Sequence, residues 1–262
     1  MSFIGAVEGA IFAGAVGLAA YQAHVLTRDG ALAAFAVGTI VFGIGGWPGA
    51  AVLFAFFLTS AALSRAGRAR KRSLIDAGKP GARDAWQVLA NGGVAAGCML
   101  LAPWAGAPMA AAFAGAFAAA AADTWATEIG TLSRQAPRSI VTFAPVPTGL
   151  SGGVTLLGTA ATIAGAAFVG AIAQACAVGP FLAVAAGGVA GAFADSFLGA
   201  TLQALRYCPQ CGRACETNPH ACGSPTVLRR GAGWIENDAI NLAATLAGAL
   251  VAGGLAAAMR GR

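Results

Sequence analysis

Charged side chains are scarce in this sequence. Only 10% of its 262 residues are Asp, Glu, Lys or Arg, whereas a soluble globular domain carries about 25%. Apolar runs of about 17 residues or more recur along the whole length instead, and a run of that length can cross a bilayer as a helix. One such run could be a signal peptide, but a series of eight could not. The scarcity therefore excludes a soluble domain and predicts a polytopic membrane protein.

The apolar runs predict an all-α fold, a transmembrane bundle of about eight helices in a single domain covering residues 1–262. The expected helices are 3–26, 31–46, 48–65, 84–102, 108–130, 149–174, 179–204 and 236–259. The 38 glycines and the many alanines predict close packing, since small residues let helix backbones approach in lipid. A faint parallel repeat is also visible, in which 91–97 resembles 151–158 and 121–125 resembles 193–197.

Lys and Arg are absent from three of the expected connections, near 47–48, 103–107 and 175–178. Fourteen of the sixteen instead fall at Arg28, 65–83, 134–138 and 206–230. The net charge of +6 could suggest nucleic acid, but such clustering is typical of loops that stay in the cytoplasm. We expect no nucleic-acid partner and a place in a prokaryotic-type cell membrane. The loops near 65–83, 131–148 and 204–235 would be cytoplasmic and both termini outside, with Arg260 and Arg262 as the exceptions.

Acidic residues interrupt two of the apolar helices. Asp123 and Glu128 lie at the expected cytoplasmic end of 108–130, and Asp195 occupies the position in the second repeat that Asp123 has in the first. An acid at membrane depth costs roughly 2.5–3.5 kcal/mol to insert, so it usually faces a cavity or a partner. The three are candidate catalytic residues and Mg²⁺ ligands. The alternatives are a structural Asp paired with Arg, and a proton or Na⁺ relay in a transporter. Asp123 and Glu128 lie about 140° apart on a regular helix, so whether they contact one ion is open.

The sequence contains no Gly-Lys-Ser/Thr, which excludes a Walker A loop. The run "PTGLSGG" is expected to open the helix 149–174, and a helix N-terminus favours anions. A capped helix start uses the same residues, so the signal alone is weak. The candidate phosphate- and nucleotide-binding residues here are Thr148, Gly149, Ser151, Gly152 and Gly153, with Lys79, Arg83 and Arg138 as basic partners.

Two further polar groups open helices on the same expected side. Arg83, Gln87 and Asn91 precede or open 84–102, and the last helix begins with Asn237, Asp238 and Asn241. Independent structural contacts would be scattered over both sides of the membrane. The convergence on one side therefore predicts a functional site, in which Asn91, Asn237, Asp238 and Asn241 are further candidate phosphate- or nucleotide-binding residues.

Four of the six cysteines lie in one expected cytoplasmic loop, "CPQCGRACETNPHAC". A Cys-x2-Cys opening followed by further Cys and His is spacing typical of structural zinc. The candidate ligands are Cys208, Cys211, His220 and Cys222, and free thiols are the alternative. Disulfides are disfavoured in the cytoplasm.

The motifs "AADTWATEIG", "PRSI", "PTGLSGGV", "ADSFLGATLQ" and "ENDAINL" resemble the integral membrane family that includes plant phytyl-phosphate kinase and transmembrane protein 19. "GARDAWQVLANGG" and "SRAGRARK" resemble it too, so the resemblance covers almost the whole chain. It implies a membrane-embedded kinase that phosphorylates an isoprenyl (phytyl- or polyprenyl-type) monophosphate to the diphosphate, with CTP or ATP as donor and Mg²⁺ as cofactor. Some relatives lack the Cys/His loop, which argues against a catalytic role for it.

The expected site suits that reaction, because the isoprenyl tail can stay in lipid while the phosphate meets the nucleotide at the cytoplasmic face. Asp123, Glu128 and Asp195 would hold Mg²⁺, while Arg83, Arg138 and Lys79 would clamp phosphates. The main alternative is an ion-coupled transporter. A cytidylyltransferase, which would release pyrophosphate, and a non-catalytic scaffold are two more.

Overall fold

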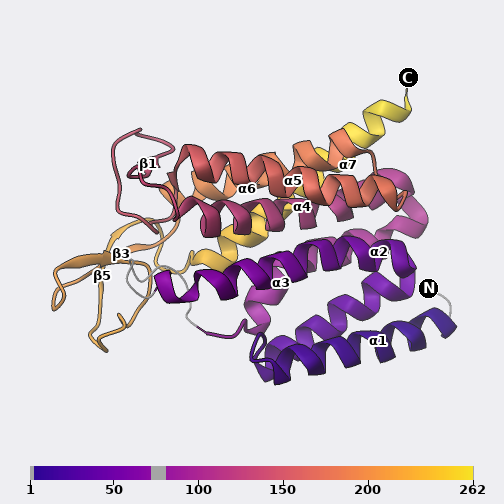
Figure 1. Cartoon of the computed structure of the whole chain (residues 1–262), viewed down its shortest axis with the longest axis horizontal. Coiled ribbons are helices and arrows are strands. Elements are labelled where there is room, and N and C mark those ends of the chain that lie inside the picture. The colour runs from indigo at the N-terminus through magenta and orange to yellow at the C-terminus, as the bar shows by residue number, and fades with distance from the viewer. Residues whose placement is uncertain (1–2, 72–80, 262) are drawn as a thin grey trace.

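The structure is a computed structural model that describes residues 3–71 and 81–261. Seven helices form a bundle, and two small sheets lie at one end of it (Figure 1). The helices are α1 (Phe3–Gln22), α2 (Arg28–Lys71), α3 (Ala85–Ala105), α4 (Ala107–Gly130), α5 (Leu156–Ala175), α6 (Phe181–Thr201) and α7 (Asn237–Arg260). The strands are β1 (Arg138–Ser139), β2 (Gly153–Val154), β3 (Leu205–Cys208), β4 (Arg213–Cys215) and β5 (Val227–Arg230), with β1 antiparallel to β2, and β3 between β4 and β5.

Helix α2 is a hairpin of two helical arms. A straight helix of its 44 residues would be about 66 Å long, more than twice the roughly 30 Å hydrocarbon core of a bilayer. The backbone leaves the helical conformation at Gly46, with φ 55° and ψ −151°, just before Pro48. The Phe12 ring of α1 packs against both Phe42 and Phe54, which lie on either side of this break. The two arms are the expected helices 31–46 and 48–65, so seven helices account for eight expected spans.

All seven helices are long and apolar enough to cross a membrane. The polytopic helical bundle expected from the sequence is confirmed. The small differences are at helix ends: α1 stops at Gln22 rather than at 26, α3 extends to Ala105, and α6 stops at Thr201 rather than at 204.

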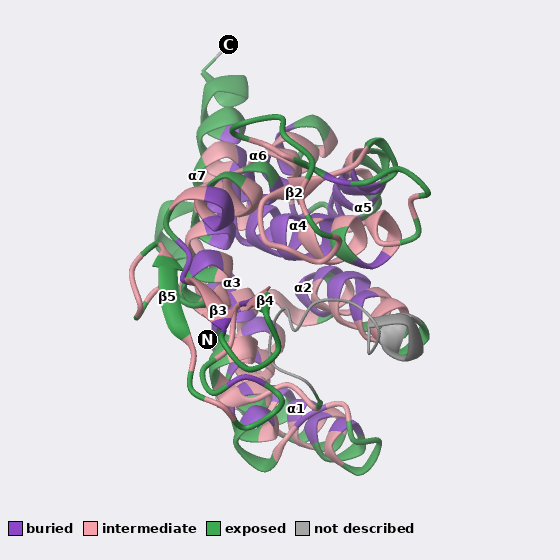
Figure 2. Ribbon diagram, turned by 90° about the vertical axis from the view of Figure 1, so that its left-hand side faces the viewer, coloured by how far each residue is buried: buried purple, intermediate pink, exposed green. Residues whose placement is uncertain are grey.

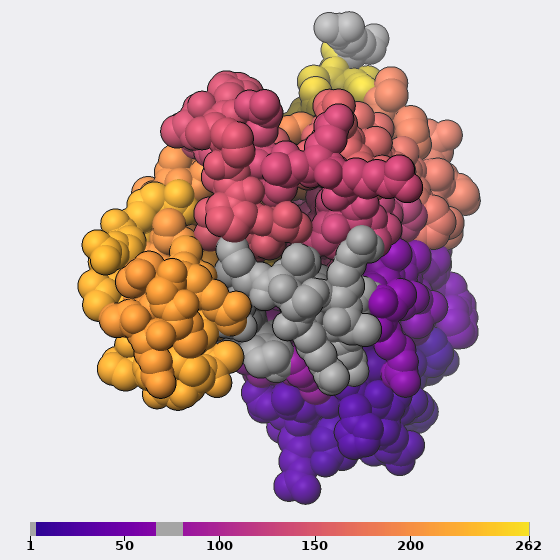
Figure 3. Space-filling view, turned by 60° about the vertical axis from the view of Figure 1, so that its left-hand side comes forward, coloured from indigo at the N-terminus to yellow at the C-terminus, as the bar shows by residue number. Residues whose placement is uncertain are grey.

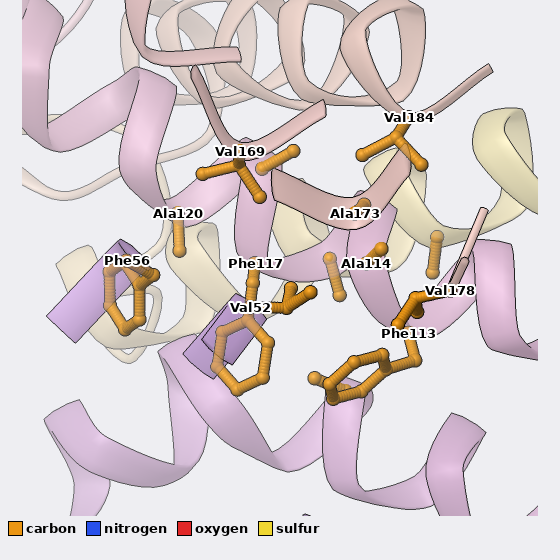
Figure 4. Close-up of a cluster of buried hydrophobic side chains, with 14 of the residues drawn as sticks. Val52, Phe56, Phe113, Ala114, Phe117, Ala120, Val169, Ala173, Val178 and Val184 are labelled. Atoms are coloured by element: carbon orange, nitrogen blue, oxygen red, sulfur yellow. The ribbon is translucent and has the colours of Figure 1, made fainter. Parts of the chain in front are cut away.

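Helix α4 is the centre of the bundle. It contacts α2, α3, α5, α6 and α7, and every residue from Ala111 to Ala122 is buried (Figure 2). Phe113 and Phe117 project from it and pack edge to face, and Phe117 also stacks on Phe56 of α2 (Figure 4). The small alanine side chains allow five helices to surround one.

Glycines permit the closest crossings, between α4, α6 and α7. A Cβ atom on Gly191 would lie 2.4 Å from Cβ of Ala119 and 2.7 Å from the carbonyl oxygen of Ala244. A Cβ atom on Gly248 would lie 2.7 Å from the same Ala119 Cβ. No side chain fits at such distances, so the glycines set the spacing of the three helices. The close packing predicted from composition is confirmed here.

The expected helix start at 149 is wrong. Helix α5 begins at Leu156, and Thr155 caps it by accepting a hydrogen bond from the Gly158 amide at 2.9 Å. Residues 148–152 belong to a loop that β1 and β2 close, in which Gly149 and Gly152 have positive φ, and Gly153 begins β2. The segment "SGGVTLLG" thus precedes or begins a helix, whereas "NGGVAAG" lies inside α3. Only the second half of the repeat, around Asp123 and Asp195, occupies equivalent places near the ends of α4 and α6.

The basic loops gather at one end of the bundle. The β1–β2 loop and the β3–β5 sheet lie at that end, while the described ends of the chain lie at the opposite one (Figure 1). Alternation of the helices places the Arg28 turn and the start of α3 at the loop end as well, where the backbone of Arg83 pairs with Leu26. The segments rich in Lys and Arg are therefore together, as the sequence predicts.

Candidate functional site at the loop end

Two intramembrane carboxylates meet between α4 and α6. Asp195 interacts electrostatically with Asp123, and also with Glu216 from the loop before β5. Its Oδ2 atom is buried and has no hydrogen-bond partner among the described residues. Like charges repel and a buried, unsatisfied carboxylate oxygen is costly. A pair of this kind fits a bound cation.

The second acid of α4 faces a different neighbour. Glu128 is buried, and its charge interacts with Arg83 at the start of α3. Burial lowers the pKa of Arg83, and the Glu128 carboxylate opposes that shift. Asp123 thus turns toward α6 and Glu128 toward α3, as their angular separation on the helix requires. Among the described residues, Asp123, Glu128 and Asp195 do not bring three carboxylate oxygens within 4.8 Å of one another.

Arg83 is fixed by its backbone. Its amide donates to the Val25 carbonyl at 2.9 Å, and its carbonyl accepts from the Thr27 amide at 3.0 Å. The next residue, Asp84, caps α3 in a capping box with Gln87. The guanidinium therefore projects from a rigid corner between the α1–α2 turn and α3.

An apolar pocket leads away from Arg83 between α1, α2, α3 and α4. Its polar lining residues are Arg83, Gln87 and Asn91, all at the loop end of α3. Its apolar lining continues to Phe42 and Ala50, which flank the α2 hairpin turn at the other end of the bundle. The pocket thus has a polar end beside Arg83 and an apolar body that extends along the membrane-spanning helices.

The predicted phosphate cradle holds a carboxylate of the protein itself. The Ser151 amide donates to Glu216 Oε1 at 2.8 Å and the Ser151 hydroxyl donates to Oε2 at 2.9 Å. Gln203 Nε2 adds a third donor, 2.9 Å from Oε2. Burial raises the pKa of Glu216, and these donors and the nearby Arg230 only partly oppose the shift. Ser151 thus donates to a carboxyl group of the chain itself, and it does so from a loop and not from a helix start.

Gly152 brings this loop onto α6. Its φ is +82°, and a Cβ atom there would lie 2.4 Å from Cβ of Ala200. The loop therefore packs directly over the end of the helix that carries Asp195. Close packing against α6 therefore requires a glycine at this position of the "SGG" run, in addition to the positive φ.

The remaining predicted residues that the structure describes lie at the same end of the bundle. Arg138 is exposed, and its Nη1 donates to the Phe143 carbonyl of its own loop at 2.9 Å. Asn91 donates within α3 to the Gln87 carbonyl. Thr148 and Gly149 lie in the β1–β2 loop, Gly153 begins β2, and Asn237, Asp238 and Asn241 occupy the first turns of α7. Lys79 lies outside the described residues.

The cysteine-rich loop brings all four predicted ligands together. The ligand atoms of Cys208, Cys211, His220 and Cys222 lie within 4.8 Å of one another. His220 lowers the pKa of the Cys222 thiol to about 6 through its hydrogen bond, whereas the hydrogen bond to Cys222 raises the pKa of Cys211 to about 11. The Cys222 thiolate, the form that binds metal, is therefore accessible near neutral pH.

Sequence reasoning missed Glu216 and Arg230. Both lie in the polar loop between α6 and α7, where a single charged residue is unremarkable and no periodicity marks it. The one usable signal was the proximity of Glu216 to the cysteines.

The fold and the site define a polytopic helical membrane protein with a polar site at one end of its bundle. Residues 11–249 match the family described as "Integral membrane protein DUF92", and the chain belongs to this family. The family resemblance inferred from the motifs is thereby confirmed.

Relatives with similar sequences occur in plants, archaea and cyanobacteria. The chain is 33% identical over 230 residues to Protein PGR of Arabidopsis thaliana, covering 76% of this chain and 79% of that protein. It is 30% identical over 185 residues to an uncharacterized membrane protein of Methanocaldococcus jannaschii (70% and 76%). It is also 30% identical over 145 residues to one of Synechocystis sp. (53% and 56%). No solved structure matches the chain.

Proposed function

We propose that this protein is a membrane-embedded phosphotransferase that converts an isoprenyl monophosphate to the diphosphate, using a nucleoside triphosphate and Mg²⁺. The observation that carries the proposal is the amphipathic pocket, which has Arg83 at its polar end and aromatic and aliphatic side chains along its length. A lipid with a phosphate head and a hydrocarbon tail matches that distribution. We further propose that the loop end is cytoplasmic, which gives the site access to nucleotide.

The acids support a site for Mg²⁺ at the same end of the bundle, on the α6 side of α4. Asp123 and Asp195 offer hard oxygen ligands from neighbouring helices, and Oδ2 of Asp195 is buried with no described donor. Mg²⁺ usually takes one or two carboxylates and fills its other positions with water or phosphate oxygens. When bound, it would supply the positive charge that neutralises the transferring phosphoryl group. That Glu128 is a third ligand of the same Mg²⁺ remains a prediction.

The side chains of the protein would mainly position the reactants. Arg83 would bind the acceptor phosphate, with Glu128 holding the guanidinium in place, and Gln87 and Asn91 would contribute amides beside it. The acceptor is already ionised near neutral pH, since its second pKa is about 6, so no strong general base is needed. Burial of the tail between the helices would fix the head group at the loop end.

The transporter alternative requires polar access from both sides. The buried or half-buried acids of the described helices, Asp123, Glu128, Asp195 and Asp238, all lie toward the loop end. Glu8 of α1 is exposed. No described chain of acids crosses the bundle, which supports an enzyme over an ion-coupled carrier.

The test is an assay of the purified protein in detergent with Mg²⁺. Phytyl, geranylgeranyl and longer polyprenyl monophosphates would each be combined with CTP or ATP, and products identified by mass spectrometry. We expect a prenyl diphosphate and a nucleoside diphosphate in equal amounts. Release of pyrophosphate would instead indicate a cytidylyltransferase, and no product with any pair from well-folded protein would reject the proposal. Solute flux in proteoliposomes without nucleotide would favour the transporter.

A further inference from the structure

The Cys/His cluster has the dimensions of a tetrahedral metal site. Cys208 Sγ lies 3.6 Å from Cys222 Sγ, and His220 Nδ1 lies 3.6 Å from Cys211 Sγ and 3.0 Å from Cys222 Sγ. Zinc–sulfur bonds of about 2.3 Å and zinc–nitrogen bonds of about 2.0 Å put tetrahedral ligands roughly 3.5–3.8 Å apart. The two 3.6 Å distances match this range, and the 3.0 Å distance between His220 and Cys222 is shorter. A disulfide would instead require about 2.05 Å between sulfurs.

Two tight turns present these ligands. Cys208 and Cys211 flank the turn between β3 and β4, where the Gly212 amide donates to the Cys208 carbonyl at 2.9 Å and Gly212 has φ +66°. His220 and Cys222 flank the second turn, where Gly223 has φ +84° and its amide donates to the His220 carbonyl. Each turn ends on a glycine in a conformation that other residues rarely adopt. The loop backbone therefore preorganises both pairs of ligands.

The ligand chemistry selects the metal and its role. Three thiolates and one imidazole suit zinc far better than Mg²⁺ or Ca²⁺, and four protein ligands leave no open position for a substrate. Cys215 lies in the same loop but outside the set, and its Sγ donates to the Thr217 carbonyl. This cysteine is a natural internal control.

Glu216 lies between the two ligand pairs, five residues after Cys211 and four before His220. Its carboxylate is the group that binds Ser151 and Gln203 and interacts with Asp195. Figure 3 shows the loop carrying it as a lobe at the loop end of the bundle, beside residues 131–155. A constraint on the two turns is thus also a constraint on Glu216.

We propose that Cys208, Cys211, His220 and Cys222 bind one structural Zn²⁺, and that this zinc holds Glu216 against Ser151 and Gln203 beside Asp195. The zinc closes the loop over the ends of α4 and α6 and takes no part in chemistry. Because binding and docking can be measured without any substrate, the proposal stands or falls independently of the phosphotransferase reaction.

The first test measures metal content by inductively coupled plasma mass spectrometry on protein purified without chelators. We expect about one zinc per chain in the wild type and in Cys215→Ser, and less than a tenth of that in Cys211→Ser. Iron in place of zinc, a metal-free wild type, or equal loss in Cys215→Ser and Cys211→Ser would overturn the ligand set.

The second test follows docking by hydrogen exchange of the Ser151 amide, which donates to Glu216. We expect at least a tenfold faster exchange after zinc is removed with a chelator, and recovery when Zn²⁺ alone is added back. Glu216→Ala should keep its zinc yet show the same fast exchange. Chelation gives the result on wild-type protein even if Cys211→Ser fails to fold. Unchanged exchange on zinc removal would overturn the positioning role.

Discussion

At the scale of single residues, the central feature is the pair Asp123 and Asp195. An acid pair at the end of two helices is costly unless a cation or a proton compensates it. The structure gives Asp195 a buried oxygen with no described donor, which makes it the more sensitive of the two. Replacing an Asp with Asn removes its negative charge and nearly preserves its shape, so the role of each acid can be tested separately.

Asp195→Asn should lower the rate of prenyl-phosphate phosphorylation at least about 100-fold, because it would remove a proposed Mg²⁺ ligand from the site. Its thermal unfolding in detergent should remain within a few degrees of the wild type. Glu8→Gln is the matched control, since Glu8 is an exposed acid of a different helix. Full activity of Asp195→Asn would contradict the metal-ligand role.

Arg83→Gln should raise the KM for the prenyl monophosphate more than about tenfold, since it would remove the guanidinium that we propose binds the acceptor phosphate through paired contacts. Arg83→Lys should recover only part of this, because an ammonium cannot form the same paired contacts. Arg134, exposed in the loop after α4, supplies the control Arg134→Gln. Equal effects at Arg83 and Arg134 would show that the effect is general surface charge and not binding.

At the scale of elements, the contacts of α4 with α6 and α7 depend on glycine. Gly248→Ala places a methyl group 2.7 Å from Cβ of Ala119 and 2.8 Å from the Gly115 carbonyl oxygen. Overpacking of this kind typically costs about 1–3 kcal/mol, so the melting temperature in detergent should fall. Gly254→Ala on the same helix meets nothing within 4 Å and should leave it unchanged or slightly raised. A similar melting temperature for both variants would contradict the packing account.

The elements also show what the sequence could predict. Helix ranges were recoverable because apolar length is a strong signal, and the break at Gly46 followed from the Gly-Trp-Pro turn. The start of α5 could not be predicted, because Leu150 and the small residues around it extend the apolar pattern to positions before Leu156. The loop conformation there depends on Glu216, which lies 65 residues away from Ser151. A contact between residues so far apart leaves no pattern in the local sequence that could predict it.

The four metal-ligand candidates were recoverable for the opposite reason. Cys208 and Cys211 are close in sequence, as are His220 and Cys222. Their spacing alone therefore predicts that each pair can bind one metal ion. Asp123 and Asp195 were linked through the repeat, and Arg83 and Glu128 only through their shared side of the membrane. The partner of each acid could not be predicted from the sequence, because it depends on how α3 and α6 pack around α4.

At the scale of the whole molecule, the gathering of the basic loops at one end predicts a single orientation. Alkaline phosphatase fused after Ala105, at the turn between α3 and α4, should be active because that turn would lie outside the cytoplasm. The same reporter fused after Thr142, in the β1–β2 loop, should be inactive, whereas a fluorescent-protein fusion there should fluoresce. The reverse pattern would place the site on the outer face, away from cytoplasmic nucleotide.

Phosphoryl transfer at the loop end is the central proposal, and the transferred phosphate can be traced directly. Purified protein would be incubated with Mg²⁺, a prenyl monophosphate and a nucleoside triphosphate labelled at its γ-phosphate. The account predicts that label appears in the prenyl diphosphate with wild type and Glu8→Gln, and is lost with Asp195→Asn. Folded wild-type protein that leaves all label in the nucleotide or in free phosphate, with every acceptor and donor, would contradict it.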